Sequence, residues 1–189
     1  MNHPLHPIRE YYLNCFRESV VKARSELDQF TTELLMEIPT LKYKEYCYRL
    51  YRVDIIGKKN GESKILEVNV TERQAMKPES FSASHVCFDA PIVWNGVEFE
   101  VQDSSPDEPA LIEWTSRWMD IFDSKYKKAA EFQEAVHSVT PPTITASGFS
   151  ISVDFGSAPT SAFDELTEIL SRDSRKVSIG SFFLFRENA

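Results

Sequence analysis

The chain has 189 residues, of which 42% are apolar, and 29 acidic residues against 21 basic ones give a formal net charge of −8. This length fits one domain, and thirteen Phe with seven Tyr supply enough apolar surface for a packed core, which excludes a disordered chain. The charge repels phosphate, so it disfavours nucleic-acid binding and anionic membranes, and it is compatible with a basic protein partner or with solubility alone.

The cysteines and the N-terminus predict a cytoplasmic protein. Cys15, Cys47 and Cys87 are odd in number and far apart, which is typical of reduced thiols in a reducing compartment. The first residues lack the charged start and apolar run of a signal peptide. No apolar segment approaches the roughly 18–20 residues that are needed to cross a bilayer.

The N-terminal segment 1–40 is predicted to be largely helical. Apolar residues recur three or four positions apart from Ile8 to Met36, Pro7 suits a first turn, and Pro39 marks a stop. An unbroken helix of this length would span roughly 40 Å, so it either breaks near Ser25 or extends beyond the domain body. Its apolar stripe could pack on the chain's own sheet or dimerise, so monomer and homodimer both stay open.

The middle of the chain predicts two hairpins. Strands over 43–56 and 65–70 flank a polar turn at 57–62, and a shift in the apolar phase near Leu50 predicts a bulge there. In the second hairpin, over 92–101, Asn95-Gly96 lies between alternating residues and favours a two-residue turn with positive φ at both positions.

The remaining segments complete an α+β fold. We expect helices over 110–122 and 125–136, a strand over 149–155, a helix over 161–171, and a last strand over 177–185. Together these elements predict a single domain over 1–189. It has a mostly antiparallel sheet of about six strands, helices packed on one face, and a C-terminal β-α-β unit.

The sequence contains no recognisable set of catalytic or metal-binding residues. The histidines, His3, His6, His85 and His137, fall into no metal-ligand spacing, and the six glycines form no phosphate-binding loop. No serine lies in a G-x-S-x-G elbow. We therefore expect no catalytic residue, no metal and no cofactor, and we expect His137 at a helix end, where it favours the helix dipole.

An enzymatic alternative rests on Asp54 and Glu67, one on each strand of the first hairpin. Two carboxylates brought together in this way can hold Mg²⁺, as in a divergent metal-dependent hydrolase. The pair faintly resembles the D…E-x-K arrangement of metal-dependent nucleases, but Asn69 occupies the position of the lysine. An acidic surface would also repel DNA. The plainer interpretation is two outward-facing polar residues on a half-solvated hairpin.

The segment from Ile92 to Asp123 holds all three tryptophans and a dense run of carboxylates. Tryptophan is enriched at protein-binding hot spots, and surrounding acids attract a basic partner by electrostatic steering. Twin tryptophans one helical turn apart can also be core residues. The predicted partner contacts are Asp103, Asp107, Glu108, Glu113, Trp114, Trp118 and Asp120.

Three motifs resemble those of the immunity proteins of bacterial polymorphic-toxin systems. They are Trp94-Asn95-Gly96, Trp114…Trp118-Met119-Asp120, and Asp154-Phe155-Gly156 before a helix and a final strand. The resemblance covers the C-terminal half. It implies an acidic cytosolic α+β domain without catalytic residues, which binds and neutralises a basic toxin such as a nuclease.

Overall fold

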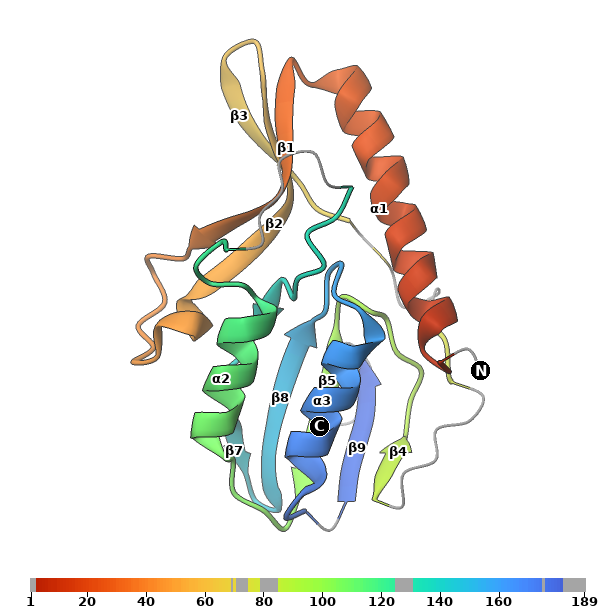
Figure 1. Ribbon diagram of the computed structural model, residues 1–189, viewed down its shortest axis with the longest axis vertical. Coiled ribbons are helices and arrows are strands. Elements are labelled where there is room, and N and C mark those ends of the chain that lie inside the picture. The colour runs from red at the N-terminus through yellow and green to blue at the C-terminus, as the bar shows by residue number, and fades with distance from the viewer. Residues whose placement is uncertain are drawn as a thin grey trace.

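The computed structural model describes residues 3–68, 70, 75–78, 85–124, 131–174 and 176–181. In that part of the chain, helices and strands form a mixed α+β structure with two mostly antiparallel sheets, which confirms the predicted fold class. The smaller sheet lies at one end of the longest axis and the larger sheet at the other (Figure 1). None of the described helices is long and apolar enough to span a membrane.

The smaller sheet has the order β1-β2-β3, from Gln29–Glu37, Leu50–Lys59 and Glu62–Leu66. β2 and β3 form the first predicted hairpin, and its turn is Asn60-Gly61, with φ of 52° and 83°. Asn and Gly tolerate such angles, which is why this pair closes a two-residue turn.

The larger sheet contains β4 (Val86–Phe88), β5 (Val97–Gln102), β6 (Ser138–Val139), β8 (Gly148–Asp154) and β9 (Lys176–Ser181), in the order β4-β9-β5-β8-β6. A short strand, β7 (Thr143–Thr145), also pairs with β8. β8 and β9 are both antiparallel to β5, so they run parallel to each other on its two sides. The helix between them completes the predicted β-α-β unit.

Two helices, α2 (Glu108–Trp118) and α3 (Thr160–Ser171), lie side by side on one face of the larger sheet (Figure 1). Val97, Phe99 and Val101 of β5 are buried, whereas the residues between them are half-buried, so the alternating strand turns its apolar side to these helices. Phe99, Phe155 and Phe163 meet there, with ring centroids 5.5–6.3 Å apart.

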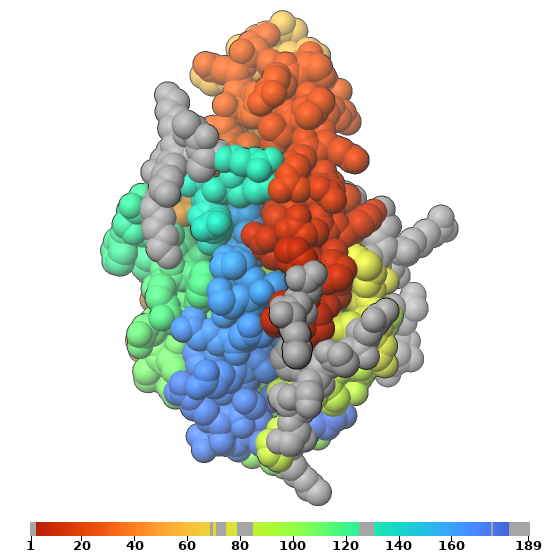
Figure 2. Space-filling view, turned by 45° about the vertical axis from the view of Figure 1, so that its right-hand side comes forward, coloured from red at the N-terminus to blue at the C-terminus, as the bar shows by residue number. Residues whose placement is uncertain are grey.

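α1 (His6–Glu26) runs alongside the smaller sheet, and its N-terminal end reaches the near end of the larger sheet (Figures 1 and 2). Near its start, the Arg9 guanidinium donates to the carbonyls of Ser157 and Ala158, beside α3. The stripe of Ile8, Tyr12, Phe16 and Ala23 is buried in the chain's own core. Since this packing occupies the stripe, the geometry does not favour dimerisation through it.

Of the two predicted alternatives, a helix that breaks near Ser25 agrees with the observed end at Glu26, and a helix as far as Met36 is wrong. The helix ends where Leu27 adopts extended angles, and β1 begins at Gln29. Thr31 and Thr32 are β-branched, which favours a strand, and β1 gains a ladder of backbone bonds with β2. Long-range pairing therefore overrides a helical period that was coincidental after Leu27.

Three other local predictions are wrong. A 3-10 helix, Tyr46–Arg49, precedes β2 and causes the phase shift that predicted a bulge. The chain turns at Val93–Gly96, but neither Asn95 nor Gly96 has positive φ, and no hairpin forms there because Ile92 pairs with Met76 and β5 with β8 and β9. Residues 131–136 are not helical, whereas 125–130 lie outside the described residues.

Candidate functional site

Three predicted contact residues gather at the end of the molecule where α2 begins. Asp107 is the N-cap of α2, and its Oδ1 accepts a hydrogen bond from the backbone N–H of Ala110 at 3.2 Å. Glu108 follows in the first turn. Asp103 comes directly after β5, and its N–H donates to the carbonyl of Ser147 in the turn before β8. All three acids are exposed. The negative charges of Asp107 and Glu108 also interact favourably with the positive end of the α2 dipole.

A shallow groove with an apolar floor lies beside these acids, between the start of α2 and the end of α3. Leu111, Phe149 and Leu170 line it, and Asp107 and Asp173 stand at its border. We call this the α2–α3 groove, and we call Asp103, Asp107, Glu108 and Asp173 the acidic rim. Arg172 also borders the groove, with its guanidinium 3.9 Å from Glu168 of α3. The groove encloses about 20 Å³, far below the roughly 300–1,000 Å³ of small-molecule sites.

A larger hollow of about 300 Å³ lies over β1 and β2, and Phe30, Ile56 and Lys58 are among its lining residues. Lys58 is the one charged side chain among the residues described there. The described part of its lining therefore contains no paired acid and base of the kind that a hydrolytic site needs.

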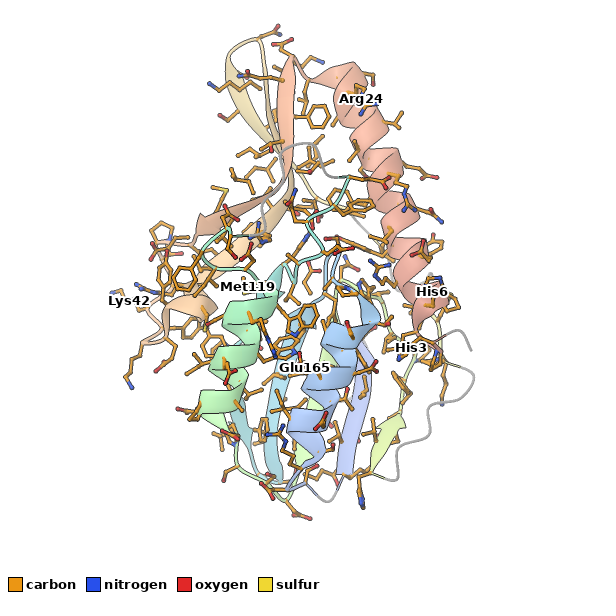
Figure 3. All side chains as sticks on the ribbon, viewed as in Figure 1. His3, His6, Arg24, Lys42, Met119 and Glu165 are labelled. Atoms are coloured by element: carbon orange, nitrogen blue, oxygen red, sulfur yellow. The ribbon has the colours of Figure 1, made fainter. Side chains whose placement is uncertain are left out.

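Trp114 is not a surface residue, so the prediction that it contacts a partner is wrong. It is 1% exposed, its indole N–H donates to the carbonyl of Ala162 at 3.1 Å, and its ring lies edge-on to Phe155. Trp118 is half-buried against α3, where its N–H donates to Glu165, which also pairs with Arg117 at 2.9 Å. Glu165 is labelled on α3 in Figure 3. Neither tryptophan lies among the lining residues of the groove.

Of the other two predicted acids, Glu113 is exposed on α2 and Asp120 is only 7% exposed. Asp120 adopts φ of 47°, and its Oδ1 accepts two hydrogen bonds from Ser124. It lies past the far end of α2, roughly 16 Å along an 11-residue helix from Glu108. Its carboxylate stabilises a turn, so the prediction that it lies in the contact surface is wrong.

Arg52 fixes the chain after α2 against the smaller sheet. Its guanidinium is 1% exposed and donates to the carbonyls of Glu33, Met119 and Asp120 at 2.7–3.1 Å, and to Asp123 Oδ1 at 2.7 Å. A planar fork of N–H donors suits such a set of acceptors. The buried cation thus joins β1, β2 and the end of α2.

A second group of charged residues lies inside the molecule, where the two sheets meet. His137 is 1% exposed; its Nε2 lies 2.9 Å from Glu33 Oε1, and its Nδ1 lies 2.9 Å from Asp54 Oδ1. The Tyr12 hydroxyl donates to Asp54 at 2.8 Å, and the Ser157 hydroxyl donates to Glu33. We call these five residues the junction cluster.

The charges of the junction cluster shift one another's pKa. Burial alone lowers the pKa of His137, but its hydrogen bonds with Asp54 and Glu33, and the charges of Asp154 and Glu33, raise it well above the ordinary value. Burial raises the pKa of Asp54, yet His137 and the N–H of Val68 outweigh it and lower that pKa. Burial and the Asp54 charge raise the pKa of Asp154 to about 7, against the opposing effect of His137.

The hairpin does bring Asp54 and Glu67 together. Burial, followed by hydrogen bonding and repulsion from Asp54, raises the pKa of Glu67, while the Tyr51 hydroxyl donates to it. Asp54 is 3% exposed, so the expectation that it faces solvent is wrong. Its oxygens accept from Tyr12 and Val68, and one of them lies 2.9 Å from His137 Nδ1. The described residues contain no group of three or more His, Cys, Asp or Glu placed to hold a metal. This geometry does not favour the metal-dependent hydrolase.

The junction cluster was missed because its members are far apart in the sequence. Glu33 and His137 are separated by 104 positions, and Glu33 and Ser157 by 124. The expectation that His137 ends a helix is wrong, because its N–H donates to the carbonyl of Asp154 in β8. Glu33 carried one signal, since an acid within a run of Thr and Leu is unusual for a buried strand.

Comparison of the chain with protein-family models, with curated proteins and with solved structures finds no match. The function is therefore inferred from the site itself.

Proposed function

We propose that this chain is a non-enzymatic, cytoplasmic protein-binding domain. In this proposal the acidic rim and the α2–α3 groove receive a basic segment of a protein partner, as in an immunity protein that neutralises a basic toxin such as a nuclease. The observation that supports it best is that Asp107 and Asp173 line a groove with an apolar floor, while exposed Asp103 and Glu108 lie close to Asp107 in the chain.

The shape of the groove supports a protein partner over a small molecule. It is too small to enclose a metabolite, but the half-buried Ile169 at its apolar floor can contact an apolar side chain or the aliphatic stem of a lysine or arginine. Exposed carboxylates at its border raise the association rate with a cationic surface and discriminate against acidic ones. Glu113 is a further exposed acid on α2.

Binding to a defined candidate tests this proposal. The product of the gene adjacent to this one is purified, and its affinity for the chain is measured by calorimetry at several salt concentrations. We expect the Asp107→Asn/Glu108→Gln double variant to bind about tenfold or more weakly, and to show a smaller dependence on salt. Asn still caps a helix, so the change removes charge without removing the cap.

A matched control separates local from general charge. Glu18 and Glu26 are exposed acids of α1, so the Glu18→Gln/Glu26→Gln variant carries the same change in net charge on another element. We expect its affinity to stay within about twofold of the wild-type value, since its charges lie outside the rim. Equal affinities for the wild type and the rim variant, in a confirmed complex, would show that the acidic rim is not the docking surface.

A further inference from the structure

Both ring nitrogens of His137 face carboxylate oxygens in a site that excludes water. Each nitrogen lies 2.9 Å from its oxygen, on Glu33 at one side and Asp54 at the other, and the three residues are at most 3% exposed. A neutral imidazole has one N–H, so it would donate to one carboxylate and turn a lone pair toward the other. The imidazolium form donates to Glu33 from Nε2 and places its positive charge 2.9 Å from Asp54, where Nδ1 forms an ion pair without hydrogen-bond alignment. The geometry therefore calls for a buried proton.

No neighbouring donor in this geometry is placed to replace that proton. Asp54 also accepts from the Tyr12 hydroxyl at 2.8 Å and the Val68 N–H at 2.6 Å. Glu33 accepts from the Ser157 hydroxyl and the Gln133 N–H, the latter at 2.6 Å. These donors are neutral and already in use. Loss of the His137 proton would leave two buried negative charges without a counter-charge in the cluster.

The elements that meet at His137 come from both sheets. Glu33 lies on β1, Asp54 on β2 and Tyr12 on α1, whereas His137 directly precedes β6 of the larger sheet. The backbone of His137 makes the same connection, because its carbonyl accepts from the Arg52 N–H at 2.8 Å and its N–H donates to the Asp154 carbonyl at 2.9 Å.

We infer that His137 is a proton-binding site that controls the contact between the two sheets. With the proton bound, the imidazolium holds β1 and β2 against the segment that leads into β6. When alkaline pH removes the proton, repulsion between the Glu33 and Asp54 carboxylates opens this contact.

The direction of the pH effect follows from the surrounding charges. The titratable groups that face His137 are Glu33, Asp54 and Tyr12 of the smaller sheet and α1, and Asp154 of β8, with Glu67 one contact further away. The pKa of His137 is raised, so its stabilisation is complete below the unfolded value, about 6.5, and is lost as pH rises through the folded pKa. The pKa of Asp54 is lowered, so its stabilisation is lost only in acid.

Nuclear magnetic resonance of the wild-type chain tests the proton directly. The imidazole ¹³C and ¹⁵N signals of His137 are followed from pH 5 to 10, and they are assigned by their disappearance in His137→Gln or by through-bond correlation. We expect the imidazolium signature to persist at pH 8. A ring that is neutral at pH 7, or that titrates near 6.5, would overturn the inference, and this measurement needs no variant that folds poorly.

Unfolding by urea between pH 7 and 9 tests the consequence of losing the proton. Linkage predicts that the wild-type unfolding constant rises by up to tenfold per pH unit in this range. We expect His137→Gln to lack this slope, because Gln takes up no proton. Tyr12→Phe removes a donor from the same cluster without removing the proton, so it should keep the slope. A His137→Gln variant with the wild-type slope would contradict the inference.

Hydrogen exchange locates the opening. The amide of Arg52 joins the two sheets through the carbonyl of His137, whereas the amide of Phe99 lies within the β5 ladders of the larger sheet. After correction for intrinsic exchange, we expect opening at the Arg52 amide to increase above pH 7 by tenfold or more, with little change at Phe99. An equal increase at both amides would point to global unfolding and would reject a local release.

Discussion

The junction cluster and the acidic rim both concentrate charge, but the junction cluster is shielded from water and the acidic rim is exposed to it. Glu33 and Asp54 are both buried. Glu33 accepts three hydrogen bonds, whereas Asp54 accepts two and lies 2.9 Å from His137 Nδ1 as an ion pair. Asp107 and Glu108 are exposed at a helix start. Buried charges stabilise a fold only when they are fully paired, whereas exposed charges contribute little to folding and act at a distance on partners. The charges that stand out in the sequence are therefore not those that hold this structure together.

That contrast predicts the largest loss of stability where a buried cation is removed. Replacing Arg52 with Met keeps the aliphatic stem but leaves the carbonyls of Glu33, Met119 and Asp120 without their donor. We expect the free energy of unfolding to fall by about 4 kcal/mol, because each unsatisfied buried group costs about 1–3 kcal/mol. Urea denaturation measures this, and a loss below about 1 kcal/mol would show that water replaces the guanidinium.

Close packing around His137 predicts the next largest effect. Gly156 has φ of +49°, and a Cβ at this position would lie 2.0 Å from the His137 ring. We expect Gly156→Ala to lower the free energy of unfolding by about 3 kcal/mol, through backbone strain and overpacking together. Gly61→Ala is the matched control, since Gly61 also has positive φ (+83°) but nothing within 4 Å, and it should lose only about 1 kcal/mol.

The pH dependence of stability provides a further test of the buried charges, because the pKa of Asp154, beside the junction cluster, is raised to about 7. The folded state then holds a proton that the unfolded chain releases near pH 4. The contribution of Asp154 to stability is present in acid and declines as pH rises from about 4 to 7. Asp154→Asn should remove this part of the pH dependence, as measured by urea unfolding at half-unit steps. Parallel curves for the two proteins would contradict the assignment.

The smallest effect is expected at the exposed rim. Asp107→Ala removes the N-cap of α2, which should cost about 1 kcal/mol, whereas Asp107→Asn keeps an acceptor for the Ala110 N–H and should change stability by only a few tenths. Thermal unfolding of the two variants measures the difference. If both lost several kcal/mol, the rim would contribute to the fold in the same way as the buried cluster, and the contrast would fail.

Local patterns predicted the elements whose stability is decided locally. Alternation over 149–155 and helical spacing over 161–171 correspond to β8 and α3, since each pattern places one apolar side against the core. The same reasoning failed at Gln29–Glu37 and around Asn95-Gly96, where partners distant in the chain decide the conformation. Sequence alone gave no register, so it could not bring the junction residues together.

The exposure of the predicted contact residues could be anticipated from the sequence only in part, for a similar reason. Asp107 and Glu108 are polar residues at the start of a helix, just before its apolar stripe, and residues at such positions are usually exposed. Trp114 and Trp118 lie one turn apart on that stripe, and sequence spacing does not tell which turn of the stripe is covered by a second helix. α3 covers Trp114 completely and Trp118 in part.

The order of strands in the larger sheet has a consequence for synthesis. β4 pairs with β9 alone among the described strands, and β9 also supplies one side of β5, yet β9 emerges from the ribosome after all of them. β4 therefore cannot pair with β9 until about ninety further residues have been translated. A nascent chain halted before Lys176 should remain protease-sensitive in this sheet, while its β2–β3 hairpin could already have formed.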